Sequence, residues 1–457
     1  MKHVPLFLFL LIGTASFAQE AKLEKQVLEY TVDSIFSKYI QDYRTVKIHL
    51  PKDYAEGEKY PTIYTLDGEW MFEPGFMTTK ILSDFDVIPK SIVVGIFHKN
   101  RNEDLEINWE TGEFVKGSSN FFSFLTKELV PKIDSIYSTS GFNVLIGHSN
   151  SATFSHKVLT QKVQPFNGVI ALSQNLFGQQ LQEYIEFTKT VNKPTFYFVA
   201  SGKRDATPRL ESGMKLDSEF KINKNSSINS LHIVYDADHN GIAAKGISNG
   251  IAHVFSEYKH YNDWDDNLID SLIDKNIGPI DFIDQHSEKM KNIYGVNFKV
   301  NQDDLSLMSA LTENTSDVEK LEEFEIEHFG KSSEFYAMYA QSYEYINDFE
   351  KALEYWSIHL EENSENISNF FYYRRPIELL NKKMKQPKRA IEFAVKWKKQ
   401  APEYSLFFNY YIATIALENN IKKKVGLDAI KEFIENYNKE SGLDFEEAKE
   451  IERRLKQ

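Results

Sequence analysis

Cysteine is absent from all 457 residues of the chain. The protein therefore cannot form a disulfide, use a thiolate nucleophile, bind zinc through thiolates or carry a lipid on a cysteine. Positive charge is also in short supply, because 53 Lys and Arg residues stand against 67 Asp and Glu residues, for a net charge of −14. The sequence has no Lys/Arg run of the kind that nucleic-acid binding requires. We therefore expect no nucleic-acid partner, and we interpret the acidic surface as a means of staying in solution.

Long apolar runs are missing beyond the N-terminus, so no transmembrane segment is expected. At the N-terminus, Lys2 and His3 precede an apolar run over residues 4–12, and Ser16-Phe17-Ala18 forms a small-x-small cleavage pattern. These features predict a secretory signal peptide over residues 1–18. The mature protein is therefore expected in a periplasm or outside the cell.

Metal-binding motifs are missing too. The sequence has no HExxH motif and no close cluster of His and Asp residues, and His98 lacks partners at metal-ligand spacing. Neither a catalytic metal nor another cofactor is expected.

The chain does have the length and the apolar content, 42% of its residues, for two packed domains. In the first half, residues 28–32 and 45–50 alternate apolar and polar side chains, which predicts an antiparallel pair at a sheet edge. Residues 61–66 and 91–96 are nearly continuous apolar runs, which are typical of central parallel strands. Further strands are predicted at 143–146, 166–173, 194–200 and 231–235, and helices at 120–136, 152–159 and 181–191. This alternation predicts an α/β fold with a mostly parallel sheet of about eight strands flanked by helices.

The segment Gly147-His148-Ser149-Asn150-Ser151 follows one of these apolar strands and precedes a predicted helix. A strand–turn–helix with Ser at the turn is the nucleophile-elbow arrangement, which lifts a hydroxyl above the edge of the sheet. The tight turn needs small residues two positions before and after the Ser. Gly147 satisfies the first position, whereas Ser151 stands where the usual pattern has Gly.

Two more reactive residues follow predicted strand ends. Asp205 comes after strand 194–200, and His239 comes after strand 231–235. A Ser hydroxyl needs a His as base, and the His needs an acid that fixes its tautomer. The order Ser149, Asp205, His239 is the order that α/β-hydrolases use. The sequence therefore predicts a catalytic triad of these three residues.

The first half, from about Tyr30 to Tyr258, resembles the "Putative esterase" branch of the α/β-hydrolases. This branch contains esterase D and the ferric-enterobactin esterases. Besides the elbow and Asp238-His239-Asn240, the resemblance is carried by RTVKIHLP at 44–51, YPTIYTLDG at 60–68, VGI at 94–96 with Arg101 and Asp104-Leu105, and FFSFLTKELVPKIDSIY at 121–137. The branch includes S-formylglutathione hydrolases, feruloyl and acetylxylan esterases and mycolyltransferases. The sequence departs from it at Asn150-Ser151-Ala152, where the family usually carries Gly residues. The resemblance implies an α/β-hydrolase fold and serine esterase activity.

Position and resemblance together imply the remaining parts of the site. The oxyanion hole is expected to use the backbone N–H of Asn150 and a second N–H around Gly68 and Glu69. For the acid, Glu211 is an alternative to Asp205. Asp236 and Asp238 lie too close to His239 in sequence to orient its ring easily.

Four further side chains lie near these motifs. Trp70 and Phe72 either wall a substrate pocket or pack beneath the loop. Arg101 either holds a substrate carboxylate or pairs with Asp104 structurally, and we favour the structural role. His148 is interpreted as a packing or hydrogen-bonding residue of the elbow.

The second half is helical and acidic. Residues 279–294 are predicted to form a helix that Gly295 ends. Beyond residue 330, Ala352, Ala390 and Ala429 recur in similar helical contexts at spacings of 38 and 39 residues. They resemble tetratricopeptide repeats, with a period longer than the usual ~34 residues. Such repeats either bind a peptide or protein partner or brace the catalytic domain, and both interpretations stay open. We expect four tyrosines to fill helix interfaces, namely Tyr372, Tyr373, Tyr410 and Tyr411.

The predicted organisation is a signal peptide over residues 1–18, an esterase domain over 19–262, a helical connector over 263–330 and an all-α, tetratricopeptide-like domain over 331–457. The predicted function is a secreted serine esterase that cleaves a small-molecule or glycan-linked ester through an acyl-enzyme. Transfer of the acyl group to a sugar or alcohol would need only a different acceptor. The alternative is a catalytically inert hydrolase fold that acts as a scaffold through its helical repeats.

Overall fold

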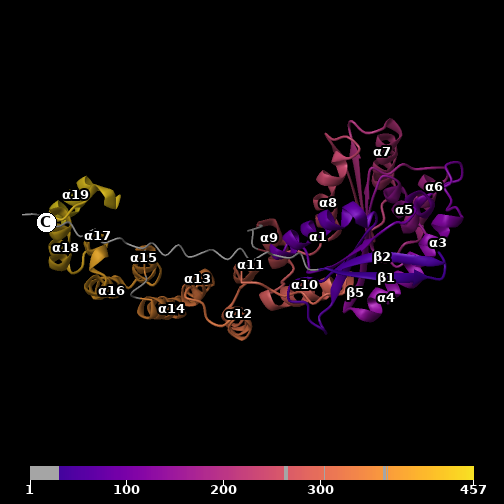
Figure 1. Ribbon diagram of the computed structural model, residues 1–457. Helices are drawn as coiled ribbons and strands as arrows, with labels where there is room; N and C mark the ends of the chain where they lie inside the picture. Colours follow the sequence, from indigo (N-terminus) through magenta and orange to yellow (C-terminus); the bar gives the residue numbers. More distant parts are fainter. Residues whose placement is uncertain (1–29, 262–265, 303, 364–366, 368) are drawn as a thin grey trace, which may run out of the picture.

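The computed structural model describes residues 30–261, 266–302, 304–363, 367 and 369–457. The predicted signal peptide, residues 1–18, lies outside the described residues. A domain built on one sheet holds the first half of the chain, and a row of helices extends away from it toward the C-terminus (Figure 1). Within the described ranges, none of the helices is both long and apolar enough to span a lipid bilayer.

The sheet has eight strands in the order β1-β2-β4-β3-β5-β6-β7-β8. β1 is antiparallel to β2, and β2 is antiparallel to β4, whereas all other pairs are parallel. The predicted fold class, a mostly parallel sheet of about eight strands with an antiparallel edge pair, is confirmed. The strands are β1 (Thr31–Ser37), β2 (Asp42–His49), β3 (Tyr60–Thr65), β4 (Ile92–Ile96), β5 (Thr139–His148), β6 (Gly168–Leu172), β7 (Thr195–Gly202) and β8 (Ile228–Tyr235).

The first strand does not lie where its alternation predicts it. The pattern favours residues 28–32, but β1 runs from Thr31 to Ser37. Val32 is 62% exposed, whereas Ile35 is buried against the sheet core. The inward-facing side chains of β1 are therefore those of Ile35 and Ser37. Of the apolar residues that suggested the strand, Leu28 lies outside the described residues, Tyr30 precedes β1 and Val32 faces outward.

Helices cover both faces of the sheet. One face packs against α3, α4, α5, α6 and α7, and its core includes Phe121, Phe154 and Leu216. The other face packs against α1, α8 and α10, and its core includes Phe72 and Ile242. The helices of this half are α1 (Gly68–Asp84), α2 (Arg101–Leu105), α3 (Lys116–Phe124), α4 (Val130–Ile136), α5 (Asn150–Leu159), α6 (Gln180–Thr190), α7 (Thr207–Ile222) and α8 (Gly241–Val254). A π-helical turn, Leu125–Leu129, joins α3 to α4, so the predicted helix 120–136 is one continuous element with an earlier start.

The second half is all-helical, as predicted. Its helices are α9 (Asp266–Asp274), α10 (Pro279–Tyr294), α11 (Asp304–Ala310), α12 (Thr315–His328), α13 (Phe335–Tyr345), α14 (Phe349–Glu362), α15 (Phe371–Glu378), α16 (Pro387–Gln400), α17 (Ser405–Glu418), α18 (Lys423–Glu435) and α19 (Phe445–Leu455). From α12 onward each helix packs against the next along the chain. Ala352, Ala390 and Ala429 are buried on α14, α16 and α18, where small side chains allow neighbouring helices to approach.

The helix α10 joins the two halves. Gly295 ends it with a φ of 67°, as its position in the sequence predicts. Met290 and Tyr294, near the C-terminal end of α10, belong to the core on one face of the sheet. Ile283, about two to three turns earlier, belongs to the core of the helical half. The division of the chain at residues 262 and 330 stays a prediction, but one helix of the predicted connector contributes to both cores.

Candidate active site

Ser149 stands in a sharp turn between β5 and α5. Its φ of 65° and ψ of −123° are far from the conformations that side-chain-bearing residues prefer. Position 147 has no room for a side chain, because a Cβ there would lie 2.4 Å from the carbonyl oxygen of Ser151. This is the strained strand–turn–helix that presents a nucleophile at the edge of a sheet.

The structure brings the three predicted triad residues together. His239 Nε2 lies 3.0 Å from Ser149 Oγ, and His239 Nδ1 lies 3.0 Å from Asp205 Oδ1. Each residue follows the carboxyl end of a parallel strand, β5, β7 or β8, so the three loops meet at one edge of the sheet. Glu211, the alternative acid, is exposed on α7, and it is Asp205 that meets the imidazole.

Asp205 is stabilised as a carboxylate. Burial alone would raise its pKa, but a hydrogen bond from the Ser173 hydroxyl, one from the Ala206 N–H and the nearby His239 together lower the pKa below its usual range. Ser173 Oγ also lies 2.9 Å from His239 Nδ1. Sequence reasoning missed Ser173, which carries no motif. The one available signal was that a Ser closes a predicted strand.

Ser151, the departure from the family pattern, is built into a buried hydrogen-bond network. Its hydroxyl accepts the backbone N–H of His148 at 2.7 Å and lies 2.7 Å from Asp67 Oδ2, to which it donates. Both Ser151 and Asp67 are fully buried. Asp67 directly precedes α1, and Ser151 lies in the first turn of α5. The network therefore ties the N-termini of these two helices together.

Arg101 does not pair with Asp104, and that expectation is wrong. Its guanidinium instead binds Asp67 through Nε at 2.5 Å and Nη2 at 3.0 Å. Asp104 is turned inward, 2% exposed, and is held by Arg44 at 2.9 Å and by His98 at 3.0 Å. Arg101 neutralises the buried carboxylate that Ser151 also contacts, which is consistent with the favoured structural role.

The backbone donors predicted for the oxyanion hole lie at two helix N-termini. Gly68 and Glu69 open α1, and Asn150 opens α5. N–H groups in the first turn of a helix have no partner within that helix and attract negative charge. Gly68 is required, because a Cβ there would lie 2.9 Å from the backbone nitrogen of Ile96 and 2.8 Å from the ring of Phe97.

His148 supports the loop that carries His239. Its Nε2 donates to the backbone carbonyl of His239 at 2.8 Å. Burial lowers the pKa of His148 to about 4, so the ring is neutral at physiological pH. Trp70 packs edge-on against the ring, with 5.2 Å between the ring centroids.

A cleft of about 760 Å³ opens beside Ser149. It lies between α1 and α8 and is mostly apolar away from the reactive residues. Trp70 lines it, whereas Phe72 is fully buried in the core beneath. Trp70 therefore forms part of the pocket wall, and Phe72 packs beneath the loop. The lining residues are Trp70, Met71, Pro74, Arg101, His148, Ser149, His239, Asn240, Ala243, Ala244 and Ile247.

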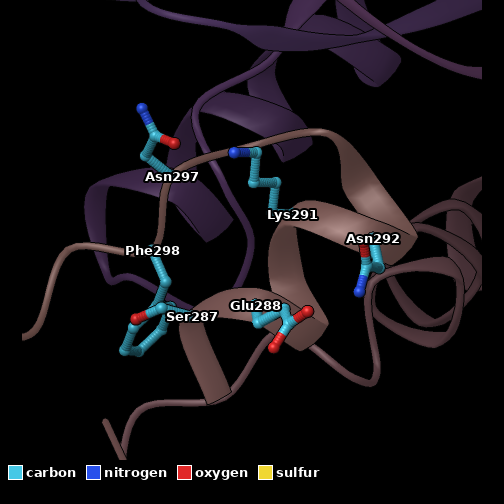
Figure 2. Close-up of a pocket in the computed structure, with 6 residues that line it drawn as sticks. All are labelled: Ser287, Glu288, Lys291, Asn292, Asn297 and Phe298. Atoms are coloured by element: carbon cyan, nitrogen blue, oxygen red, sulfur yellow. The ribbon is translucent and has the colours of Figure 1, made fainter. Parts of the chain in front are cut away.

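A second hollow of about 420 Å³ lies on α10 and the segment after it (Figure 2). Its lining is polar apart from one aromatic ring, and it includes none of the predicted site residues. The residues around it are Ser287, Glu288, Lys291, Asn292, Asn297 and Phe298. Of the predicted catalytic residues, Ser149 and His239 line the cleft between α1 and α8 instead.

An eight-stranded, mostly parallel sheet with Ser, Asp and His at the carboxyl ends of its strands is the architecture of the α/β-hydrolases. The model of the family described as "Putative esterase" matches residues 37–274, just over half of the chain. The chain belongs to this family and is an esterase of the α/β-hydrolase superfamily.

Solved structures share the fold. An uncharacterised protein from Capnocytophaga ochracea aligns with a TM-score of 0.59 and 19% identity, over 72% of this chain and 93% of its own. An IroE-like serine hydrolase from Shewanella oneidensis aligns with a TM-score of 0.50 and 23% identity, over 64% of this chain and 98% of its own. No curated protein sequence matches the chain.

Proposed function

We propose that the protein is a serine hydrolase that cleaves carboxylic esters through an acyl-enzyme, with Ser149 as nucleophile, His239 as general base and Asp205 as the acid that orients the imidazole. One observation carries the proposal, namely the continuous contact from the hydroxyl to the ring to the carboxylate, at 3.0 Å for each step. Family membership supports the reaction class, and the geometry supports the roles of the individual residues.

In the first step, Ser149 Oγ bonds to the ester carbonyl carbon while its proton passes to His239 Nε2. The carbon–oxygen bond to the alcohol then breaks, and the imidazolium returns the proton to the leaving oxygen. The products of this half are the free alcohol and the acyl-Ser149 ester. Water repeats the sequence with the same base, which releases the carboxylic acid and restores the Ser149 hydroxyl.

The negative charge that forms on the carbonyl oxygen needs backbone donors. We assign this role to the N–H of Asn150 and to an N–H of Gly68 or Glu69. The contact between Asp67 and Ser151 supports the assignment, because it joins the turns that carry these donors. Removal of one oxyanion donor typically costs about 3 kcal/mol of barrier stabilisation.

The substrate is proposed to be a small-molecule or glycan-linked ester with an apolar portion that fits the cleft between α1 and α8. A protein partner at the helical half and a secreted or periplasmic location are also proposed. The first follows from the stacking of α12 to α19, and the second follows from the sequence of residues 1–18.

Ser149→Ala is expected to abolish turnover of p-nitrophenyl butyrate and labelling by a fluorophosphonate probe, without a change in the circular dichroism spectrum. Ser218→Ala, which removes an exposed hydroxyl on α7, is the matched control and should retain both activities. Unchanged turnover in Ser149→Ala would refute the assignment of the nucleophile. A wild-type protein that neither turns over esters nor takes the label would instead favour the inert scaffold.

A further inference from the structure

Ser173 lies at the centre of the site without belonging to the proposed triad. It directly follows β6, its side chain is 1% exposed, and its φ is 63°. Its hydroxyl oxygen contacts Asp205 Oδ2 and lies 2.9 Å from His239 Nδ1. A non-glycine residue in the left-handed region is held there by its surroundings, and such residues gather at functional sites.

The protons can be assigned by what each atom is able to do. An ionised Asp205 only accepts hydrogen bonds, so the single hydroxyl proton of Ser173 is donated to Oδ2. The lone pairs of Ser173 Oγ then face His239 Nδ1. The Nδ1–H is therefore shared between Asp205 Oδ1 at 3.0 Å and Ser173 Oγ at 2.9 Å. With its proton held on Nδ1, the imidazole presents an unprotonated Nε2 to Ser149.

The backbone of Ser173 is anchored on both sides. Its N–H donates to the carbonyl of Ala200 in β7 at 2.8 Å. Its carbonyl accepts from Arg209 Nη1, and Arg209 Nη2 reaches Asn150 Oδ1 at 3.1 Å. The hydroxyl is thus fixed relative to the acid on one neighbouring loop and to the turn that carries the nucleophile.

We propose that Ser173 is a positioning residue. By hydrogen-bonding to both the carboxylate of Asp205 and the Nδ1–H of His239, it keeps the imidazole in the tautomer and orientation needed to accept the Ser149 proton. The proposal rests on the proposed function. Ser173 does not touch the ester. It acts through His239 and Asp205, and its loss should slow the chemical step rather than weaken substrate binding.

The test compares Ser173→Ala, Ser173→Gly and Ser201→Ala in the full-length protein. Both Ser173 variants lose the hydroxyl, but glycine adopts a positive φ without strain, so Ser173→Gly should be the more stable of the two. Ser201 is the matched control, because it is a buried Ser on β7 whose hydroxyl lies 3.0 Å from the Nε2 of His232, another imidazole. The measurements are kcat and KM with p-nitrophenyl butyrate, the unfolding midpoint and the low-field proton resonance of His239 Nδ1.

Loss of one hydrogen bond to a charged group predicts a fall in kcat of about 10- to 100-fold in both Ser173 variants, with KM little changed. The Nδ1 proton resonance should shift in both, while Ser201→Ala keeps the wild-type kcat and resonance even if its midpoint falls. Wild-type kcat in Ser173→Gly, or activity that follows stability across the three variants, would overturn the positioning role. An inactive wild-type protein, or an active Ser149→Ala, would instead overturn the proposed function on which the role rests.

Discussion

Ser151 shows how one residue that departs from the family pattern is accommodated. Glycine at this position would leave the turn free of side-chain contacts, but the Ser hydroxyl links the backbone of His148 to the buried carboxylate of Asp67. Arg101 then neutralises that carboxylate. The Ser that departs from the family pattern therefore helps to hold Ser149 and the proposed oxyanion donors in place.

Ser151→Gly is accordingly expected to lower kcat/KM although it restores the usual motif. The lost hydrogen bond to a carboxylate is worth about 1.5 kcal/mol, which corresponds to roughly tenfold if all of it is expressed in the transition state. Steady-state kinetics with p-nitrophenyl butyrate provide the measurement.

The control for this variant is Ser155→Ala, one turn later on the same helix. Ser155 is equally buried, but its hydroxyl only donates back to the carbonyl of Ser151 at 2.8 Å. It should retain nearly full activity. If Ser151→Gly proves as active as the wild type or more active, the network has no influence on the site.

The meeting of the three proposed triad residues could be predicted from the sequence, because chemistry and topology restrict their positions together. Ser149, Asp205 and His239 each follow a strand that is visible as an apolar run, and their order along the chain is informative. The partners of Arg101 and Ser173 could not be predicted. Asp67 lies 34 positions from Arg101 and Asp205 lies 32 positions from Ser173, and only the folded sheet brings them into contact.

At the level of elements, the two helices that form the cleft, α1 and α8, were difficult to predict from the sequence. Pro74 lies inside α1, and α8 carries Gly246 and Gly250 in its interior, residues that normally argue against a helix. Packing explains the two glycines. A Cβ at Gly246 would lie 2.8 Å from Leu172 in β6, and one at Gly250 would lie 2.6 Å from Ile170. Close approach of α8 to the sheet outweighs helix propensity here.

The helix α12 buries a carboxylate at the start of the helical half. Glu325 is 1% exposed, one of its oxygens has no hydrogen-bond partner among the described residues, and burial raises its pKa. A carboxyl whose folded-state pKa is raised contributes stability while it is protonated, and that contribution is lost as the pH rises through the folded-state pKa. Once the pH exceeds the folded-state pKa, the buried carboxylate is charged and opposes folding.

Glu325→Gln is expected to raise the unfolding free energy at pH 7 by about 1 kcal/mol, because the neutral amide avoids the cost of burying an ion. The difference from the wild type should disappear near the usual Glu pKa of about 4.3. Thermal unfolding across this pH range gives the measurement. Glu323→Gln, at an exposed position of the same helix, should show no such pH-dependent gain. A destabilised Glu325→Gln at pH 7 would mean that the carboxylate is needed there.

For the whole molecule, α10 is the element that decides how the two halves depend on each other. The Tyr294 ring lies among Phe142, Phe196 and Phe255, with centroid distances of 4.9, 5.8 and 5.3 Å. Its hydroxyl donates to the carbonyl of Val254 at 3.2 Å and accepts from the N–H of Glu257 at 3.1 Å. The sheet domain is thus completed by a helix that comes after the predicted boundary at residue 262. Composition alone could not reveal this, because residues 263–330 differ from the first half in charge and periodicity.

Because α10 contributes to both cores, we predict that truncation after residue 330 and truncation after residue 262 have different effects. Residues 19–330 retain α10 and the small core that joins Ile269, Leu272 and Phe282 to Leu311, and should fold with esterase activity close to that of the full chain. Residues 19–262 leave the pocket for Tyr294 empty, and loss of one buried aromatic side chain typically costs about 3–5 kcal/mol. This shorter chain should be recovered in aggregates or unfold at a much lower temperature.

Two point variants of the full chain separate the packing of Tyr294 from the length of the chain. Tyr294→Ala should reproduce most of the instability of residues 19–262, whereas Tyr294→Phe keeps the ring and should lose only the contribution of its hydroxyl, about 1 kcal/mol. Differential scanning calorimetry and ester turnover on the same samples provide the measurement. If residues 19–262 proved as stable and active as residues 19–330, α10 would be a dispensable addition. The helical half would then be a separate domain that does not contribute to the core of the esterase domain.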